Sequence, residues 1–320
     1  MNGNKRRLLI LLFACLFCAA GILAVTLESD AGADVKQHII LHLQLPMITT
    51  AALVGAVLCV SAGSLQIVLR NPLADPGLIG ISSGASLVAA VLLLLPGLSV
   101  AVPFQYLLPL GCFIGALIST FIIYRIASRL QGAAMAVILA GITISTLAGA
   151  AIAWLYMFSD AQSLRNLTFW LMGNLYQTDW HVLAISGPVM LGSIVFQLRQ
   201  AKALNWLYGG DVAAAAAGTS PQQLSVHCLL AAAIGVGAAV AVAGSIAFLG
   251  LLVPHLLRLT IGFDNRRVLP AAALSGALVL LIVALLTELT ASVTFPVSML
   301  TATVGGPLML YALYRGQYRL

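Results

Sequence analysis

The sequence predicts an all-α, polytopic membrane protein, and three observations support this fold class. Hydrophobic residues make up 61% of the 320 residues, charged residues only 8%, and the mean hydropathy is +1.07. A water-soluble domain needs roughly 25% charged residues to cover its surface. The apolar residues form continuous runs, not the alternating pattern of membrane strands, and each run suits a helix crossing about 30 Å of hydrocarbon. A soluble monomer, a disordered chain and a disulfide scaffold are therefore excluded.

Ten apolar runs are expected to cross the membrane as helices, because only a helix satisfies its own backbone hydrogen bonds in lipid. The chain is expected to form one transmembrane domain, 1–320. The expected spans are residues 8–25, 47–68, 78–96, 104–124, 134–157, 181–198, 223–243, 247–262, 268–288 and 296–314. The eighth is short and contains Pro254, His255 and Arg258, so nine spans are the alternative.

The distribution of basic residues favours ten spans with both termini in the cytoplasm. In that arrangement 12 of the 15 basic residues are cytoplasmic, and the external loops keep only Lys36 and Arg165. An excess of Lys and Arg on the cytoplasmic side is what orients membrane helices. Membrane topology therefore explains the net charge of +6 without a nucleic-acid partner. The N-terminal run after Lys5 resembles a secretory or lipoprotein signal. It is followed by further apolar runs instead of a polar domain, so an uncleaved first helix is expected.

The motifs of common enzymes and metal sites are missing from the sequence. No G-x-x-x-x-G-K-[ST], G-x-S-x-G or H-E-x-x-H occurs, the five histidines are scattered, and the five cysteines lie in apolar segments. We therefore expect no catalytic residue, no metal site and no cofactor bound by this chain. The spans are almost free of acidic residues, which disfavours an ion-coupled carrier. A pump built on this chain would take its energy from another subunit.

The connection between the second and third spans is the first segment with a specific pattern. Two prolines and three glycines interrupt the helix in R-N-P-L-A-D-P-G-L-I-G-I-S-S-G-A, residues 70–85. Non-helical backbone near a membrane is tolerated inside protein or along an aqueous cavity, so we favour a pathway wall over a cytoplasmic turn. The candidate pathway and gating residues are Asn71, Pro72, Asp75, Pro76, Gly80, Ser82, Ser83 and Gly84.

Three further segments carry a pattern. W-L-M-G-N-L, residues 170–175, lies in an expected external loop, where Trp170 is typical of an aromatic belt. The alanine-rich stretch 209–221 predicts a short cytoplasmic helix, either an ordinary loop helix or a smooth ridge for another protein's groove. In G-S-I-A-F-L-G-L-L-V-P-H-L-L-R-L, residues 244–259, a lone His255 is typical of packing, and Arg258 is expected to extend toward water.

Together and in this order, these segments resemble the FecCD family, the permease subunits of type II ABC importers for ferric siderophores, haem and cobalamin. The most specific stretches are N-P-L-A-D-P-G-L-I-G-I-S-S-G-A and G-L-x-x-P-H-x-x-R, and the resemblance runs from Leu45 to Pro307. It implies the type II importer permease fold, with ten spans in each of two copies; a homodimer is the simpler expectation. It also implies a bacterial inner-membrane location, a separate ATPase on each copy carrying ATP and Mg, and a periplasmic binding protein. The implied cargo is an iron chelate, either haem or a ferric siderophore, with cobalamin as the alternative.

The resemblance also implies roles for particular residues. The coupling helix that enters the ATPase groove would contain Gly210, Asp211, Ala213, Ala214 and Gly218, and the second motif would contribute Gly250, Pro254, His255 and Arg258.

The sequence departs from the family at the expected docking surface for the binding protein. The family has R-L-P-R where this chain has Gln44-Leu45-Pro46-Met47, and an arginine before the last span where it has Glu288. We therefore expect docking through Gln44, Met47 and Glu288 with a different charge pattern, or more weakly, and Lys36, His38 and His42 are the nearest candidate replacements for the arginines. An ion-coupled carrier and a membrane scaffold are the rival classes.

Overall fold

The computed structural model describes residues 3–28, 32–95, 103–129, 134–290 and 295–314. All regular secondary structure within these ranges is helical. Seven of the helices described there are long and apolar enough to cross a membrane. They are α1 (Gly3–Leu27), α3 (Leu45–Val68), α5 (Phe104–Arg129), α6 (Ala134–Met157), α8 (Trp180–Arg199), α11 (Pro221–Ala243) and α13 (Asn265–Leu289).

Three shorter apolar helices coincide with the remaining expected spans. They are α4 (Ile81–Leu94), α12 (Leu249–Ile261) and α14 (Val297–Tyr314). The other elements lie between spans: α2 (Ala33–Ile39), the π-helical turn η1 (Ile40–Gln44), α7 (Ala161–Leu171), α9 (Ala201–Tyr208) and α10 (Asp211–Ala216). The structure is therefore an all-helical membrane protein whose helices match the apolar runs of the sequence.

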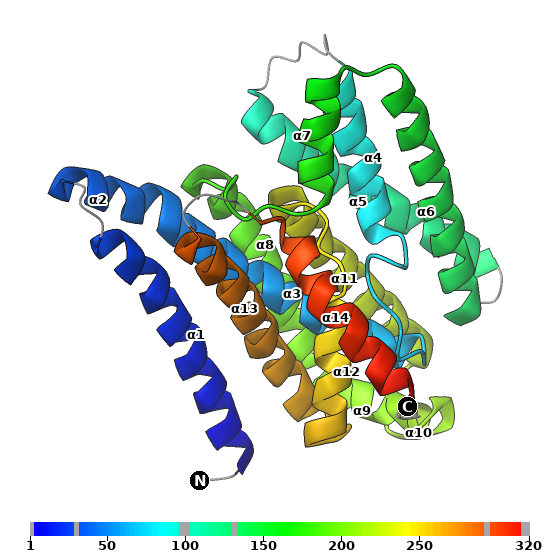
Figure 1. The fold of residues 1–320 in the computed structure, drawn as a ribbon. Coiled ribbons are helices and arrows are strands. Elements are labelled where there is room, and N and C mark those ends of the chain that lie inside the picture. The colour runs from blue at the N-terminus through cyan, green and yellow to red at the C-terminus, as the bar shows by residue number, and fades with distance from the viewer. Residues whose placement is uncertain (1–2, 29–31, 96–102, 130–133, 291–294, 315–320) are drawn as a thin grey trace.

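Helix α3 forms the centre of the bundle. It packs against α8, α11, α12 and α13, whereas α1 lies at the edge and contacts the rest chiefly through α13 (Figure 1). Glycines allow the closest of these contacts: a Cβ added to Gly55 of α3 would lie 2.2 Å from the carbonyl oxygen of Gly276 of α13. Small residues at helix interfaces let backbones approach, which is how membrane helices gain packing without a hydrophobic driving force.

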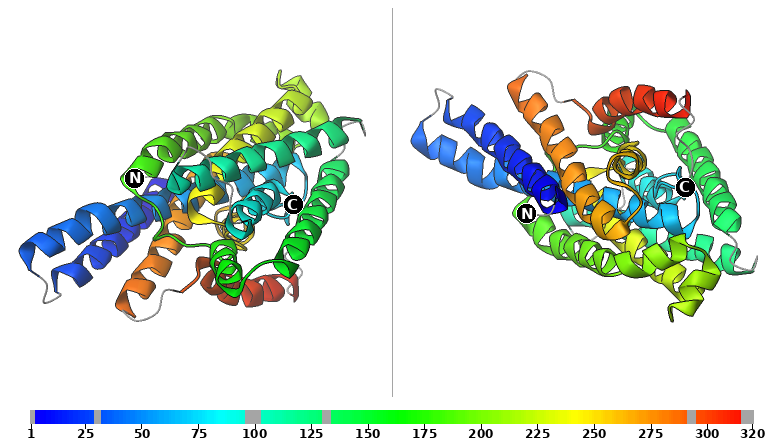
Figure 2. Two further views of the ribbon diagram at one scale, coloured as in Figure 1. Left: turned by 90° about the horizontal axis from the view of Figure 1, so that it is seen from above. Right: turned by 90° about the horizontal axis from the view of Figure 1, so that it is seen from below.

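The connecting elements are divided between the two ends of the bundle. The start of α1, the end of α14, α9 and α10 lie at one end, and α2 and α7 lie at the other (Figure 1). Both views in Figure 2 show α1 and α2 side by side at one edge of the molecule. The segments expected to be cytoplasmic thus share one end, and those expected to be external share the opposite end.

The segment 170–175 is part of the protein interior, which corrects the expectation of an aromatic belt. Trp170 is buried at the end of α7. The backbone N–H of Asn174 donates to the Ala243 carbonyl at 2.8 Å, and the Val297 N–H donates to the Gly173 carbonyl at 3.1 Å. The segment therefore holds the end of α11 beside the start of α14.

Candidate functional site

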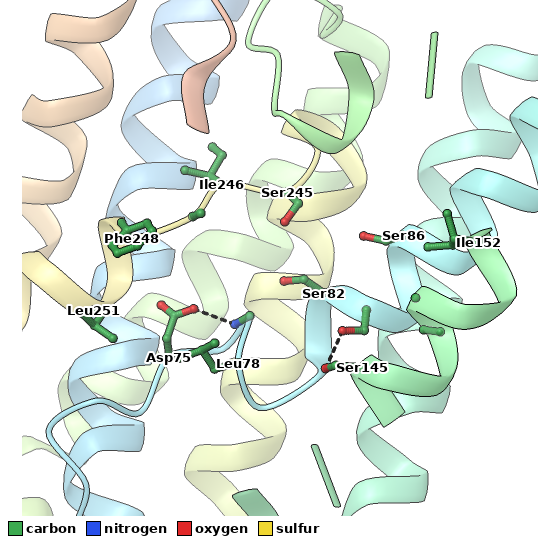
Figure 3. Close-up of a pocket in the computed structure, with 15 residues that line it drawn as sticks. Asp75, Leu78, Ser82, Ser86, Ser145, Ile152, Ser245, Ile246, Phe248 and Leu251 are labelled. Atoms are coloured by element: carbon green, nitrogen blue, oxygen red, sulfur yellow. Dashed lines mark hydrogen bonds between the residues drawn. The ribbon is translucent and has the colours of Figure 1, made fainter. Parts of the chain in front are cut away.

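The two short helices α4 and α12 begin at a common cavity of about 370 Å³ (Figure 3). They have 14 and 13 residues, and at about 1.5 Å per residue neither helix alone covers about 30 Å of hydrocarbon. Broken helices of this kind form substrate sites in membrane transporters. The cavity is lined by Asp75, Gly77, Leu78, Ser82, Ser83, Ser86, Ser145, Ala148, Gly149, Ile152, Ser245, Ile246, Ala247, Phe248 and Leu251.

Both helices start from a residue in the left-handed backbone conformation. Gly80 precedes α4 with φ of 92°, and Phe248 precedes α12 with φ of 67°. Glycine adopts this conformation without strain, whereas a bulky residue such as phenylalanine does so only where its surroundings enforce it. Phe248 also lines the cavity (Figure 3). Backbone strain is therefore stored at the cavity wall, where strained residues often serve function.

Asp75, in the segment 70–85, lies against Gly250 of the motif that contains Arg258. Its Oδ2 accepts a hydrogen bond from the Gly77 N–H at 2.9 Å, and a Cβ added to Gly250 would lie 2.6 Å from its Oδ1. The carboxylate thus stands against the first turn of α12, where the helix dipole favours a negative charge. The glycine at 250 leaves room for this carboxylate.

Serine hydroxyls supply most of the remaining polarity of the cavity. The Ser83 hydroxyl on α4 donates to the Ser145 hydroxyl on α6 at 2.8 Å (Figure 3). Ser82, Ser86 and Ser245 line the cavity with them. No group of three potential metal-ligating His, Cys, Asp or Glu side chains occurs in the described part of the chain. The wall can hydrogen-bond a passing ligand, but it offers no ligand set for a bare metal ion.

The expected pathway residues divide into two groups. Asp75, Ser82 and Ser83 line the cavity, whereas the others are not among its lining residues: Asn71, Pro72, Pro76, Gly80 and Gly84. A Cβ added to Gly84, for example, would lie 2.2 Å from the Gly115 carbonyl oxygen of α5, so this glycine permits close helix packing. The opposite wall, Ser245 to Phe248, lies in the segment 244–259 that the sequence singles out, but the sequence did not predict that these residues line the cavity. Gly244, directly after α11, marks the helix break there and has φ of 70°.

Helix α10 has the expected position and a well-defined beginning and end. Asp211 is its first residue, after Gly210 with φ of 104°. At its end Gly218, with φ of 77°, donates its N–H to the Ala215 carbonyl, which is a glycine C-cap. Ala214 is fully buried, so it anchors the helix and does not belong to an exposed docking face. Val212, which is 85% exposed, projects outward beside Ala213.

Arg258 is buried and does not extend toward water, which corrects the expectation. It is 3% exposed and donates to the Gly63 carbonyl at 2.9 Å and to Asn265 Oδ1 at 3.0 Å. The backbone N–H of Asn265 in turn donates to Asn205 Oδ1 at 2.7 Å. Pro254 and His255 of the same motif are also buried. The motif therefore ties α12 to α3, α13 and α9.

Two of the three residues expected to dock a binding protein are buried, so that expectation is wrong for them. Gln44 is 2% exposed, and its amide donates to the Ile22 carbonyl and to the Thr26 hydroxyl. Met47 is 1% exposed. Both side chains are enclosed by the rest of the chain, so neither is available to a partner.

The remaining external candidates reach the surface. Glu288 is partly exposed beside Tyr176, and burial together with this carboxylate raises the pKa of the Tyr176 phenol. The exposed rings of His38 and His42 stack with centroids 4.4 Å apart, and Lys36 Nζ donates to the Leu27 carbonyl at 2.7 Å. These groups lie at the end of the bundle that carries α2 (Figure 1).

Comparison with known proteins identifies the group to which this architecture belongs. The profile of the FecCD transport family matches residues 7–315. The chain belongs to the FecCD transport family. The match covers the cavity, α10 and the Arg258 motif together.

Individual members of the FecCD family agree with this assignment. The chain is 41% identical over 291 residues to the hemin transport system permease protein HmuU of Yersinia pestis, covering 91% of this chain and 87% of the relative. It is 36% identical over 290 residues to the vitamin B12 import system permease protein BtuC of Vibrio cholerae, covering 89% and 86%. A solved inward-facing metal-chelate-type ABC transporter superposes with a TM-score of 0.87 at 28% identity, covering 97% of this chain and 99% of that one.

Proposed function

We propose that this chain is the transmembrane permease of an ATP-driven importer that moves an intact metal chelate from the periplasm to the cytoplasm. Haem is the favoured cargo, a ferric siderophore is the next, and cobalamin is the alternative. The observation that carries the proposal is the cavity at which the broken helices α4 and α12 meet, together with the separate surface helix α10. Membership of the FecCD family and similarity to haem and vitamin B12 permeases support it.

The chemistry of the cavity fits a bulky chelate that passes without tight binding. Its volume of about 370 Å³ is at the lower end of the usual range for small-molecule pockets, roughly 300–1,000 Å³. A macrocycle would need additional space, and we propose that a second copy of the chain supplies the opposite wall of the pathway. Serine hydroxyls and one carboxylate provide hydrogen bonds without a metal-ligating set, so the metal would travel inside its chelator.

Helix α10 is the proposed contact with the ATPase. Val212 and Ala213 form a small, smooth exposed ridge, while the buried Ala214 fixes the helix to the bundle. Docking on this ridge would depend on shape more than on charge. The permease would work as a homodimer with two ATPase subunits, ten spans in each copy and both termini in the cytoplasm of a bacterial inner membrane. ATP and Mg would be bound by the ATPase.

The opposite end of the bundle is the proposed docking surface for a periplasmic binding protein. The groups there are the exposed His38 and His42 and the partly exposed Lys36 and Glu288. Charges at the rim of an interface mainly set the association rate and orientation. Lys36 would provide a positive charge, and the two histidine rings would provide hydrogen-bonding groups, that meet acidic groups of the partner.

The function is tested by reconstituting the permease with its cognate ATPase in nanodiscs. ATP hydrolysis is measured after adding binding protein loaded with haem, with a ferric siderophore or with cobalamin. Stimulation by one loaded binding protein would support the importer and name its cargo. If no ATPase forms a stable complex with the permease, an ion-coupled carrier becomes the better explanation, and uptake driven by an ion gradient alone would establish it.

A further inference from the structure

An ion pair joins the proposed coupling helix to the segment that forms the cavity wall. Arg70 Nη2 lies 2.6 Å from Asp211 Oδ1. Asp211 is the first residue of α10, and Arg70 begins the connection that leads from α3 to Asp75 and α4. Two segments that are far apart in the sequence, and that have different proposed roles, are therefore in direct contact.

Arg70 lies at a backbone position where glycine is strongly preferred. Helix α3 ends with the Arg70 N–H donating to the Ile67 carbonyl and the Asn71 N–H donating to the Gln66 carbonyl, both at 3.1 Å. This is the Schellman motif, in which glycine is strongly favoured at the left-handed position. Arg70 occupies that position with φ of 48°. A glycine would end the helix with less strain, so the arginine side chain has a purpose beyond helix termination.

Non-glycine residues in the left-handed conformation mark only two places among the described residues, Arg70 and Phe248. Phe248 lines the cavity, and Arg70 begins the segment whose Asp75 and Leu78 line it. Strained residues of this kind cluster at functional sites and moving segments. Arg70 and Phe248 thus share the left-handed backbone conformation, Phe248 at the cavity and Arg70 at the end of the bundle that carries α10.

The last turn of α3 supports both partners of the ion pair. Ile67 packs in one cluster with the buried Ala214 of α10. Leu69 packs in another cluster with Ala74 and Ile79 of the cavity segment. The end of α3 therefore shares one buried cluster with α10 and another with the cavity segment. The ion pair is a polar contact between these two segments.

We propose that Arg70 is a positioning residue that couples the ATPase-bound state of α10 to the conformation of the cavity segment, and this rests on the proposed importer function. The two side chains are 56% and 61% exposed, so the pair adds little to the stability of the isolated chain. An ATPase docked over α10 would exclude water from the pair and strengthen it. The contact then becomes stronger in the assembled transporter, where the movement of α10 must reach the pathway.

Charge reversal in the complete transporter tests this proposal. Arg70→Glu and Asp211→Lys are prepared singly and together, each reconstituted with the ATPase and binding protein. The measured quantity is substrate transported per ATP hydrolysed. We expect each single variant to lose about five-fold, the low end of typical coupling between sites, and the double variant to recover most of it. Arg70→Gly should lose coupling while unfolding at the same or a higher temperature, because glycine suits this position.

Arg267→Glu is the matched control. Arg267 is also exposed, at 57%, and pairs with Asp264 three residues away at 3.5 Å, but this pair does not join α10 to the cavity segment. Arg267→Glu should leave the amount of substrate transported per ATP hydrolysed unchanged. Additive losses in the double variant, or an unchanged ratio in Arg70→Gly, would overturn the proposal. A wild-type permease that neither binds the ATPase nor transports would instead refute the proposed importer function, so the two failures are distinguishable.

Discussion

Substitution of Gly84 by alanine should separate α4 from α5 and destabilise the cavity wall. The added Cβ would lie 2.2 Å from the Gly115 carbonyl oxygen and 2.5 Å from Ser119 Cβ. Ordinary contact begins at 3.4 Å, so the carbonyl contact is 3.4 − 2.2 = 1.2 Å too short. Because the first of these atoms belongs to the α5 backbone, no side-chain rotation relieves the clash and the helices must move apart.

The expected magnitude follows from two opposing terms. Overpacking costs about 1–3 kcal/mol, and a backbone clash of this size belongs at the upper end. Replacing glycine by alanine inside a helix returns about 1 kcal/mol of helix propensity. The net loss for Gly84→Ala is therefore about 2 kcal/mol, or a midpoint lowered by roughly 4–8 °C if about 2–4 °C corresponds to each kcal/mol.

Gly149→Ala on α6 is the control for this prediction. Gly149 lines the cavity, and nothing lies within 4 Å of an added Cβ. It should be neutral or slightly stabilising, because only the propensity term remains. Thermal unfolding of both variants is measured in one detergent beside the wild-type protein. If Gly84→Ala and Gly149→Ala share the same midpoint, α4 and α5 do not approach as closely as described.

Three more outcomes are expected. Gly250→Ala should displace the Asp75 carboxylate, because the two atoms would be 2.6 Å apart, and should lower transport while ATPase binding is unchanged in a pull-down. Arg258→Met leaves two acceptors without their charged donor, at about 1–3 kcal/mol each; denaturant unfolding should show a loss of about 2–6 kcal/mol, and wild-type stability would contradict the buried network. Hydrogen bonds from Ser163 lower the pKa of Asp160, so its cap of α7 is fully present above the ordinary carboxyl pKa and is lost as pH falls through the lowered value. The difference in thermal unfolding midpoint between wild type and Asp160→Ala should therefore shrink on acidification, and a constant difference would exclude a role for the charge.

The seven long spans were predictable from the sequence because length and apolarity decide which segments can cross a bilayer. The break before α4 was also visible, because proline and glycine interrupt helices for local reasons. Pro254, which was expected to interrupt the eighth run, lies inside the continuous helix α12, and the chain breaks before that helix instead. The short helices α7 and α9 were missed. Each is an amphipathic helix of only 11 or 8 residues, so it does not appear in a search for apolar runs long enough to cross a membrane.

Side-chain burial was the part that the sequence could not provide. Gln44 occupies a position that suits an external rim, and only the contact with Ile22 and Thr26 on α1 shows that it is inside. Arg258 lies near a helix end, where arginine normally reaches water. Its partners Gly63 and Asn265 belong to different helices, and the network continues to Asn205. Such contacts depend on how helices pack, which apolar periodicity does not specify when a helix is apolar on all sides.

The charge arrangement at the cavity explains how one acidic residue is tolerated there. Helices α4 and α12 both begin at the cavity, and each helix N-terminus corresponds to roughly half a positive charge. Two such termini amount to about one positive charge, which the single carboxylate of Asp75 balances. The wall is then close to neutral while still offering hydroxyl and carboxylate hydrogen bonds. A neutral wall neither traps nor repels a large chelate, so the pathway can release its cargo once an energy-driven movement opens it.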